Sequence, residues 1–198
     1  MKKIAIVGLF ILLSTAAFSQ MVEMDADSTT KRSIIKIEFF SPLTGNTTLG
    51  YERYLKDFTS IEFKVGIIGL GKKIDDYRSS GVFVKAGPKF KLKPEYAVAG
   101  TFGTHLLRGS YIRPEIALSI FEHERFDNPS KSITSAAILI NYGKQVILGK
   151  VMSLDWHVGL GYGFSNDDEQ GYFYGYSAGD NDFPMAFSAG FTLGVLLR

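Results

Sequence analysis

SLDWHVGLGYGFS, residues 153–165, alternates strictly between apolar residues and small or polar residues. Because successive side chains of a β-strand point to opposite faces, this period of two predicts a strand with one apolar face. Asp155 and His157 share the other face, so the stretch is also a candidate for a catalytic Asp–His pair. The apolar positions are Leu154, Trp156, Val158, Leu160, Tyr162 and Phe164.

The same alternation recurs in seven other segments, so the sequence predicts eight strands. Apolar stripes with the period of a helix are scarce, while glycine (21 residues) and the aromatic residues phenylalanine (16) and tyrosine (10) are frequent. We therefore predict an all-β fold, an eight-stranded antiparallel up-and-down β-barrel that spans a membrane. The other seven segments are 33–40, 48–55, 60–69, 81–92, 110–121, 133–148 and 185–198.

The first residues have the three-part pattern of a secretory signal peptide: Lys2 and Lys3, an apolar run, and the small-x-small end Ala17-Phe18-Ser19. The apolar run is too short for a membrane-spanning helix, which needs about 20 residues. We predict a cleaved signal peptide over 1–19, an N-terminal periplasmic segment over 20–32 and an outer-membrane barrel over 33–198.

The charge and cysteine content exclude several classes of protein. Residues 1–19 contain two lysines and no acid, so the 22 Lys and Arg residues fall to 20 in the mature chain and match its 20 Asp and Glu residues. With no basic tract either, we expect no nucleic-acid partner. The chain has no cysteine, which excludes disulfide bonds and a lipid-modified cysteine.

The connections between the predicted strands differ in length. Residues 56–59 and 149–152 are tight turns, whereas the segment 93–109 is long, and we predict that it forms an ordered insertion. Outer-membrane barrels have short turns on the periplasmic side and longer loops outside, with both termini inside. The longer, polar connections are 71–80, 122–132 and 166–184.

The face opposite the apolar one carries charges of both signs in the centres of the predicted strands. The interior of an eight-stranded barrel is just wide enough for side chains to fill. Charges there can pair, whereas charged side chains facing hydrocarbon would cost about 2–4 kcal/mol each at the midplane. We predict a lumen plugged by a charge network of Lys36, Glu38, Glu52, Glu62, Lys64, Lys85, Lys89, Arg113, Glu115, Asp155 and His157.

A soluble barrel of the lipocalin type, with an apolar interior, would show the same alternation. Three features favour the membrane barrel: the signal peptide, aromatic residues near strand ends, as in the girdles of outer-membrane barrels, and the position of the one tryptophan in the predicted strand 153–165. A lipocalin would also carry Gly-x-Trp in its first strand and a helix near its C-terminus, and the sequence shows neither. The aromatic residues are Tyr51, Phe58, Tyr142, Tyr162 and Phe164.

Over residues 33–198 the chain resembles the small Gram-negative outer-membrane β-barrels of the OmpA/OmpX type. The resemblance is carried by LGYE at 49–52, GPKFKL at 87–92 and YIRPEIALS at 111–119. It implies a monomer in the cell outer membrane, inserted by the barrel-assembly machinery and surrounded by outer-membrane lipid and lipopolysaccharide. Such barrels usually end in an aromatic residue that this machinery reads, whereas the present sequence ends in VLLR.

We expect a structural or surface-interaction role, in envelope integrity, adhesion or ligand contact through extracellular loops, without enzymatic activity. No spacing matches a metal motif such as an EF-hand, so neither a metal nor a cofactor is expected. Asp155 and His157 keep open the function of a lipid A-modifying hydrolase or acyltransferase. A narrow channel or transporter and a periplasmic lipocalin-like binding barrel also stay open. The residues predicted to make extracellular-loop contacts are Tyr172, Tyr174, Tyr176, Asp180 and Asp182.

Overall fold

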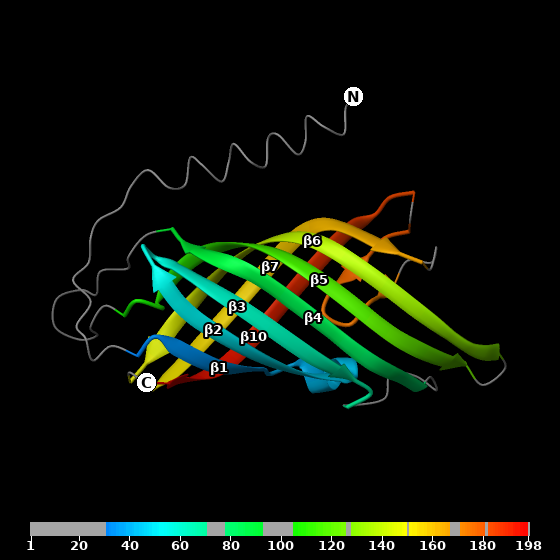
Figure 1. Cartoon of the computed structure of the whole chain (residues 1–198), viewed down its shortest axis with the longest axis horizontal. Coiled ribbons are helices and arrows are strands. Elements are labelled where there is room, and N and C mark those ends of the chain that lie inside the picture. Colours follow the sequence, from blue (N-terminus) through cyan, green and yellow to red (C-terminus); the bar gives the residue numbers. More distant parts are fainter. Residues whose placement is uncertain are drawn as a thin grey trace, which may run out of the picture.

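The described strands form one antiparallel sheet that closes on itself as a barrel (Figure 1). Each strand from β1 to β7 pairs with the next, β7 pairs with β10, and β10 pairs back with β1. The computed structural model describes residues 31–70, 78–92, 105–125, 128–149, 151–166, 171–180 and 182–197, so the predicted signal peptide and residues 20–30 lie outside the described residues. The barrel strands are β1 (Ser33–Glu38), β2 (Asn46–Lys56), β3 (Thr59–Ile68), β4 (Arg78–Lys91), β5 (Gly109–Arg125), β6 (Asn128–Leu148), β7 (Met152–Ser165) and β10 (Met185–Leu197).

The predicted eight-stranded antiparallel barrel is therefore confirmed for the described residues. Three short elements complete the fold: the 3-10 helix η1 (Ser41–Thr44), β8 (Gly171–Tyr172) and β9 (Ser177–Ala178). β8 and β9 form a hairpin that pairs with the edge of β10. Within the described ranges, no helix has the length and apolar character needed to cross a membrane.

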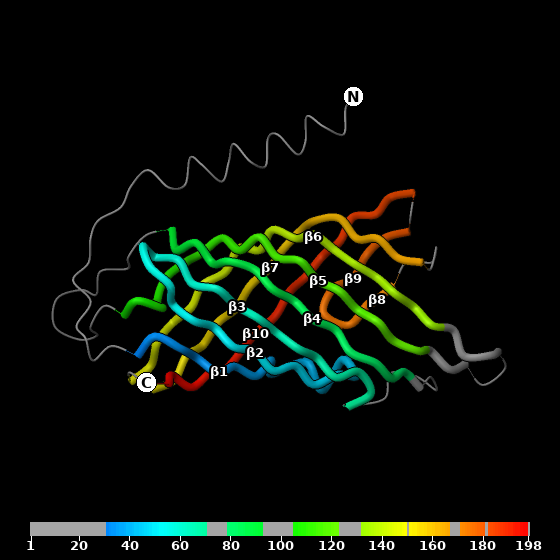
Figure 2. The backbone as a smooth tube through the Cα atoms, in the orientation of Figure 1, coloured from blue at the N-terminus to red at the C-terminus, as the bar shows by residue number. Residues whose placement is uncertain are grey.

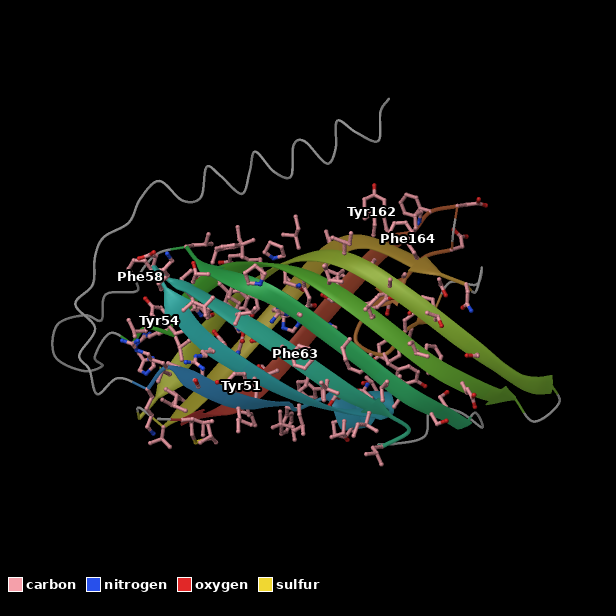
Figure 3. All side chains as sticks on the ribbon, viewed as in Figure 1. Tyr51, Tyr54, Phe58, Phe63, Tyr162 and Phe164 are labelled. Atoms are coloured by element: carbon pink, nitrogen blue, oxygen red, sulfur yellow. The ribbon has the colours of Figure 1, made fainter. Side chains whose placement is uncertain are left out.

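The period of two in the sequence separates the two faces of the wall. In β7, Asp155 and His157 are buried in the lumen, while Trp156 between them is 41% exposed. Figure 3 shows Tyr162 and Phe164 projecting away from the barrel, where both are exposed. The same arrangement holds in all eight barrel strands, so the outer surface is apolar and the inner one largely polar.

Tight turns join strands at the end of the barrel where β1 begins and β10 ends, which we call the terminal end. β2 ends at Lys56 and β3 begins at Thr59, leaving Asp57 and Phe58 with φ angles of 49° and 59°. Positive φ at both central residues is the geometry of a type I′ turn, whose twist matches that of the flanking strands. Gly149, with φ of 58°, supplies the same left-handed conformation in the turn between β6 and β7.

The prediction of a long polar loop over 122–132 is wrong. β5 continues to Arg125 and β6 begins at Asn128, with Glu122 paired to Ser132. An antiparallel ladder is held by backbone hydrogen bonds, so it continues past the point where alternation of polarity ends. Figure 1 shows this hairpin extending beyond the neighbouring strands at the end opposite the terminal end.

Apolar clusters close the barrel near both ends. At the terminal end, Leu107 packs with Ile34, Ile147 and Leu196. The Leu107 carbonyl oxygen accepts hydrogen bonds from Lys91 Nζ and Gln145 Nε2, each at 2.9 Å. Part of the predicted insertion thus lies inside the barrel, although residues 93–104 lie outside the described residues.

The opposite end is closed by the loop that carries β8 and β9. Its residues Phe173 and Tyr176 pack against Phe83, Phe121 and other apolar side chains of the wall. Figure 2 shows this orange segment turned back beside β10 instead of extending from the barrel. The charged residues of the lumen lie between the two apolar clusters.

Candidate functional site

The centre of the lumen holds three carboxylates that two lysines bridge. Lys36 Nζ, from β1, lies 2.5 Å from Glu52, 2.6 Å from Glu62 and 2.7 Å from Asp155. Lys89 Nζ, from β4, lies 3.1, 2.6 and 2.5 Å from the same three residues. All five side chains are buried, and we call this group the central cluster. Five residues from five strands meet at one point of the lumen.

Neutral polar side chains complete the hydrogen bonding of the central cluster. Tyr111 donates its hydroxyl hydrogen to Asp155 Oδ1 at 2.7 Å, and Ser60 donates to Glu52 at 2.6 Å. The Gln145 side-chain oxygen accepts from both lysines, at 2.8 Å and 3.0 Å. Such extra bonds are needed because a buried charge is costly unless it is paired and hydrogen-bonded.

Glu52, Glu62 and Asp155 present oxygens within 4.8 Å of one another, which is also the geometry of a cation site. The ammonium groups of Lys36 and Lys89 already lie against these oxygens. They supply the positive charge that a metal ion would otherwise provide. The geometry therefore matches an ion-pair cluster better than a metal centre.

A second group of charges, nearer the β8–β9 loop, is less completely paired. Arg113 is paired with Glu62 and lies 2.8 Å from Glu115, which also lies 3.3 Å from Lys85. Lys64 Nζ is buried without a hydrogen bond, and its nearest carboxylates are those of Glu62 at 3.7 Å and Glu38 at 3.9 Å.

All eleven residues of the predicted charge network face the lumen, ten of them buried and Glu38 half-buried at its edge. Lys91 joins them and lies 3.8 Å from Glu52. Among the described strand residues, the lumen then contains six basic side chains and five acidic ones. The bases are Lys36, Lys64, Lys85, Lys89, Lys91 and Arg113; the acids are Glu38, Glu52, Glu62, Glu115 and Asp155.

Asp155 and His157, the candidate catalytic pair, do not interact through a hydrogen bond. Asp155 is bonded to Lys36, Lys89 and Tyr111. His157 is buried, and neither of its ring nitrogens has a hydrogen-bond partner. Because a general-base histidine depends on a partner that orients its ring, this arrangement lacks the Asp–His dyad that the sequence suggested.

The predicted loop contacts divide into two groups. Tyr172, Asp180 and Asp182 are exposed, whereas Tyr174 and Tyr176 are only 9% and 2% exposed. Tyr176 lies in the apolar cluster, and this burial raises the pKa of its hydroxyl to about 12. Tyr174 and Tyr176 are not accessible to a partner, because their rings bury apolar area against the barrel wall. Only the first group is accessible.

Beside this loop lies an open-mouthed cavity of about 490 Å³, which the sequence did not indicate. Its lining includes His157 and Glu38 toward the charged layer, Phe83 and Tyr176 on one side, and Ser188 of β10. The sequence gives no sign of it because residues from η1, β4, β7, β10 and the loop meet only in the closed barrel.

No family model, curated protein or solved structure matches this chain. The resemblance to barrels of the OmpA/OmpX type therefore stays a prediction from short motifs. Fold alone does not identify a function. The distribution of charged and apolar side chains across the barrel wall is the more informative feature.

Proposed function

We propose that this chain is an integral outer-membrane β-barrel with a structural or surface-interaction role. The observation that carries the proposal is the inversion of polarity across the wall. Lys36, Glu62 and Arg113 are buried inside, whereas large apolar side chains are exposed outside on every barrel strand. A soluble binding barrel of the lipocalin type needs the opposite distribution.

The size of the apolar outer surface supports a lipid environment. Monomeric soluble proteins rarely expose contiguous apolar patches of more than a few hundred Å². β3, β5 and β7 run for 10, 17 and 14 residues, and about 9–11 residues suffice for a tilted strand to cross a bilayer. Outward side chains of these three strands include Ile61, Phe63, Ile116, Leu118, Ile120, Val158 and Leu160.

Aromatic residues lie toward both ends of this surface. In Figure 3, Phe58 lies toward the terminal end, while Tyr162 and Phe164 lie toward the opposite end. Outer-membrane barrels carry such residues at the two interfaces of the bilayer. In the proposed orientation the terminal end faces the periplasm, and lipid and lipopolysaccharide surround the barrel.

The lumen is blocked at its centre and at both ends, which favours a structural role over transport. Leu107 and its neighbours close one end, the central cluster fills the middle, and Phe173 and Tyr176 close the other end. Water-filled channels occur in barrels of about 16 strands or more. The proposed barrel is a monomer that the barrel-assembly machinery inserts, and it conducts no ions.

The external end supplies the surface for interaction with other molecules. It presents the extended β5–β6 hairpin and the exposed residues Tyr172, Asp180 and Asp182. The side chains of Tyr172, Asp180 and Asp182 are polar, so a partner would contact them through hydrogen bonds and electrostatic interactions. The proposed roles are envelope integrity, adhesion or ligand contact at this end.

Cell fractionation and gel mobility test the location. The full chain, expressed in a Gram-negative host, should fractionate with the outer membrane and migrate differently on a gel before and after boiling. Recovery of the mature chain as a soluble periplasmic protein would overturn the proposal. In planar bilayers the purified barrel should give no conductance above background, and stable channels would overturn the closed-lumen part.

A further inference from the structure

The cavity beside the β8–β9 loop lies where the barrel wall is incompletely paired. β1 ends at Glu38, which pairs with Thr192 of β10. β9 pairs with β10 only at Ala186 and Phe187. Between these points, residues 188–190 of β10 pair with β7 on one side. On the other side they pair with no strand in the described part of the chain.

Residues on both sides of this gap line the cavity. Phe40 and Ser41 line it from the β1–η1 side, and Ser188, Ala189 and Gly190 line it from β10. Phe40 and Phe187, which also line it, are half exposed. In the proposed membrane orientation, the gap leads from the outer half of the lipid layer into the lumen.

The cavity has the volume and lining of a small-molecule site. Its volume of about 490 Å³ falls within the range of about 300–1,000 Å³ for ligand sites, which are apolar with a few placed polar groups. Phe40, Phe83, Tyr176 and Phe191 supply apolar walls. A hydrogen bond from Tyr172 to Thr44, at 3.1 Å, joins the loop to η1 above them.

His157 supplies a polar group without a partner. It lines the cavity at 2% exposure, and both of its ring nitrogens lack a hydrogen bond. Buried polar atoms in folded proteins are nearly always bonded, so an unbonded ring next to an open cavity indicates a missing partner. Gly190 leaves room for the side chains of Glu38 and His157, because a Cβ atom there would collide with both.

The charge of the lumen selects the type of head group. Among the described strand residues the bases exceed the acids by one, and Lys64, which lacks a hydrogen bond, lies 3.9 Å from the cavity-lining residue Glu38. One added negative charge would offset this excess among the strand residues. A carboxylate also accepts hydrogen bonds from a histidine ring N–H and from a lysine ammonium.

We propose that the cavity binds one long-chain fatty acid, with its carboxylate at His157 and its alkyl chain between the aromatic walls, entering through the gap between β1 and β10. The source of the ligand rests on the proposed outer-membrane location. The binding itself does not, because it is a property of the folded barrel.

Native mass spectrometry of the full mature chain, folded in detergent, tests this site. Palmitic acid, hexadecanol and hexadecylamine share one 16-carbon chain, so the head group is the variable. Palmitic acid should give a saturable one-to-one adduct. The alcohol and the amine should bind at least tenfold more weakly. Equal binding of all three, or only a random distribution of adducts, would overturn the proposal.

Variants on one strand locate the head group. His157→Phe keeps an aromatic ring and removes both nitrogens, so palmitic acid should bind at least tenfold more weakly. Ser153→Ala is the matched control: Ser153 faces the same side of β7, is buried without a hydrogen bond and lies outside the cavity lining. This variant should bind normally. Unchanged binding in His157→Phe would overturn the assignment of the head group.

The gel-mobility shift on boiling reports whether each variant has folded. If His157→Phe does not fold, the comparison of the three ligands on the wild-type chain still decides the proposal. A barrel that fractionates with the outer membrane but binds no palmitic acid would refute this inference alone. A chain that binds palmitic acid but is found soluble in the periplasm would refute the proposed location alone.

Discussion

Replacing Lys36 by Met should strongly destabilise the barrel. Lys36 Nζ donates hydrogen bonds to Glu62, Gln145 and Asp155 and also lies 2.5 Å from Glu52. Glu52, Glu62 and Asp155 are buried, and their oxygens lie within 4.8 Å of one another. Without Lys36, Lys89 is the one lysine among the described residues that contacts all three. Removing one partner of a buried ion pair costs about 3–5 kcal/mol, and we expect a loss of that size in the free energy of unfolding.

A double-mutant cycle separates the ion pair from general packing damage. Asp155→Asn removes one of the three negative charges of the central cluster. In the Lys36→Met background it therefore removes part of the negative charge that Lys36 had neutralised. The two changes should be less than additive by about 1–3 kcal/mol. Lys56→Met, at the exposed end of β2, is the control and should change stability by no more than about 0.5 kcal/mol.

Urea titration in lipid vesicles measures these values. The chain has one tryptophan, Trp156, whose side chain faces outward and reports folding by its fluorescence. The free energy of unfolding should fall by much more than about 1 kcal/mol in Lys36→Met. A loss below about 1 kcal/mol, well under the range for a broken buried ion pair, would refute the view that the central cluster stabilises the barrel. Strict additivity in the cycle would refute the direct coupling of Lys36 to Asp155.

Three further variants and one control, Gly171→Ala, test other parts of the barrel. Leu107→Ala in the terminal-end cluster should cost about 2–5 kcal/mol in urea titration, yet show no conductance because the central cluster still fills the lumen; open channels would contradict this. Gly161→Ala should destabilise by about 1–3 kcal/mol, because the new Cβ would collide with the backbone of Ile138, whereas Gly171→Ala, with open space around it, should be neutral; equal effects would contradict the packing. Phe173→Ala should release the β8–β9 loop and create a chymotrypsin site in folded barrels, and continued resistance would show that this ring does not hold the loop.

The strands and the facing of their residues were predictable because a period of two follows directly from strand geometry. That period identified all eight barrel strands and placed residues such as Lys36 and Arg113 on the inner face. The predicted strand ended at residue 121 in β5, because the sequence of 122–132 is mostly polar and carries no alternation. Strand pairing, which continues to Arg125, depends on backbone bonds that leave no mark in the side-chain pattern.

The partners within the lumen were not predictable from spacing along one strand. Asp155 and His157 share a face of β7, yet Asp155 is bonded to residues of β1, β4 and β5. Those contacts depend on strand register and closure of the barrel, which no local motif encodes. Tyr174 and Tyr176 were expected at the surface because they lie in a polar segment, and the fold buries both.

Quenching of Trp156 fluorescence tests the outward apolar surface most directly. Trp156 lies on the outer face of β7, and its side chain is 41% exposed. In vesicles of phospholipid with brominated acyl chains, the folded barrel should lose most of its tryptophan fluorescence, and aqueous acrylamide should have little effect. Efficient quenching by acrylamide, with none by the brominated lipid, would contradict a barrel whose apolar face meets the membrane.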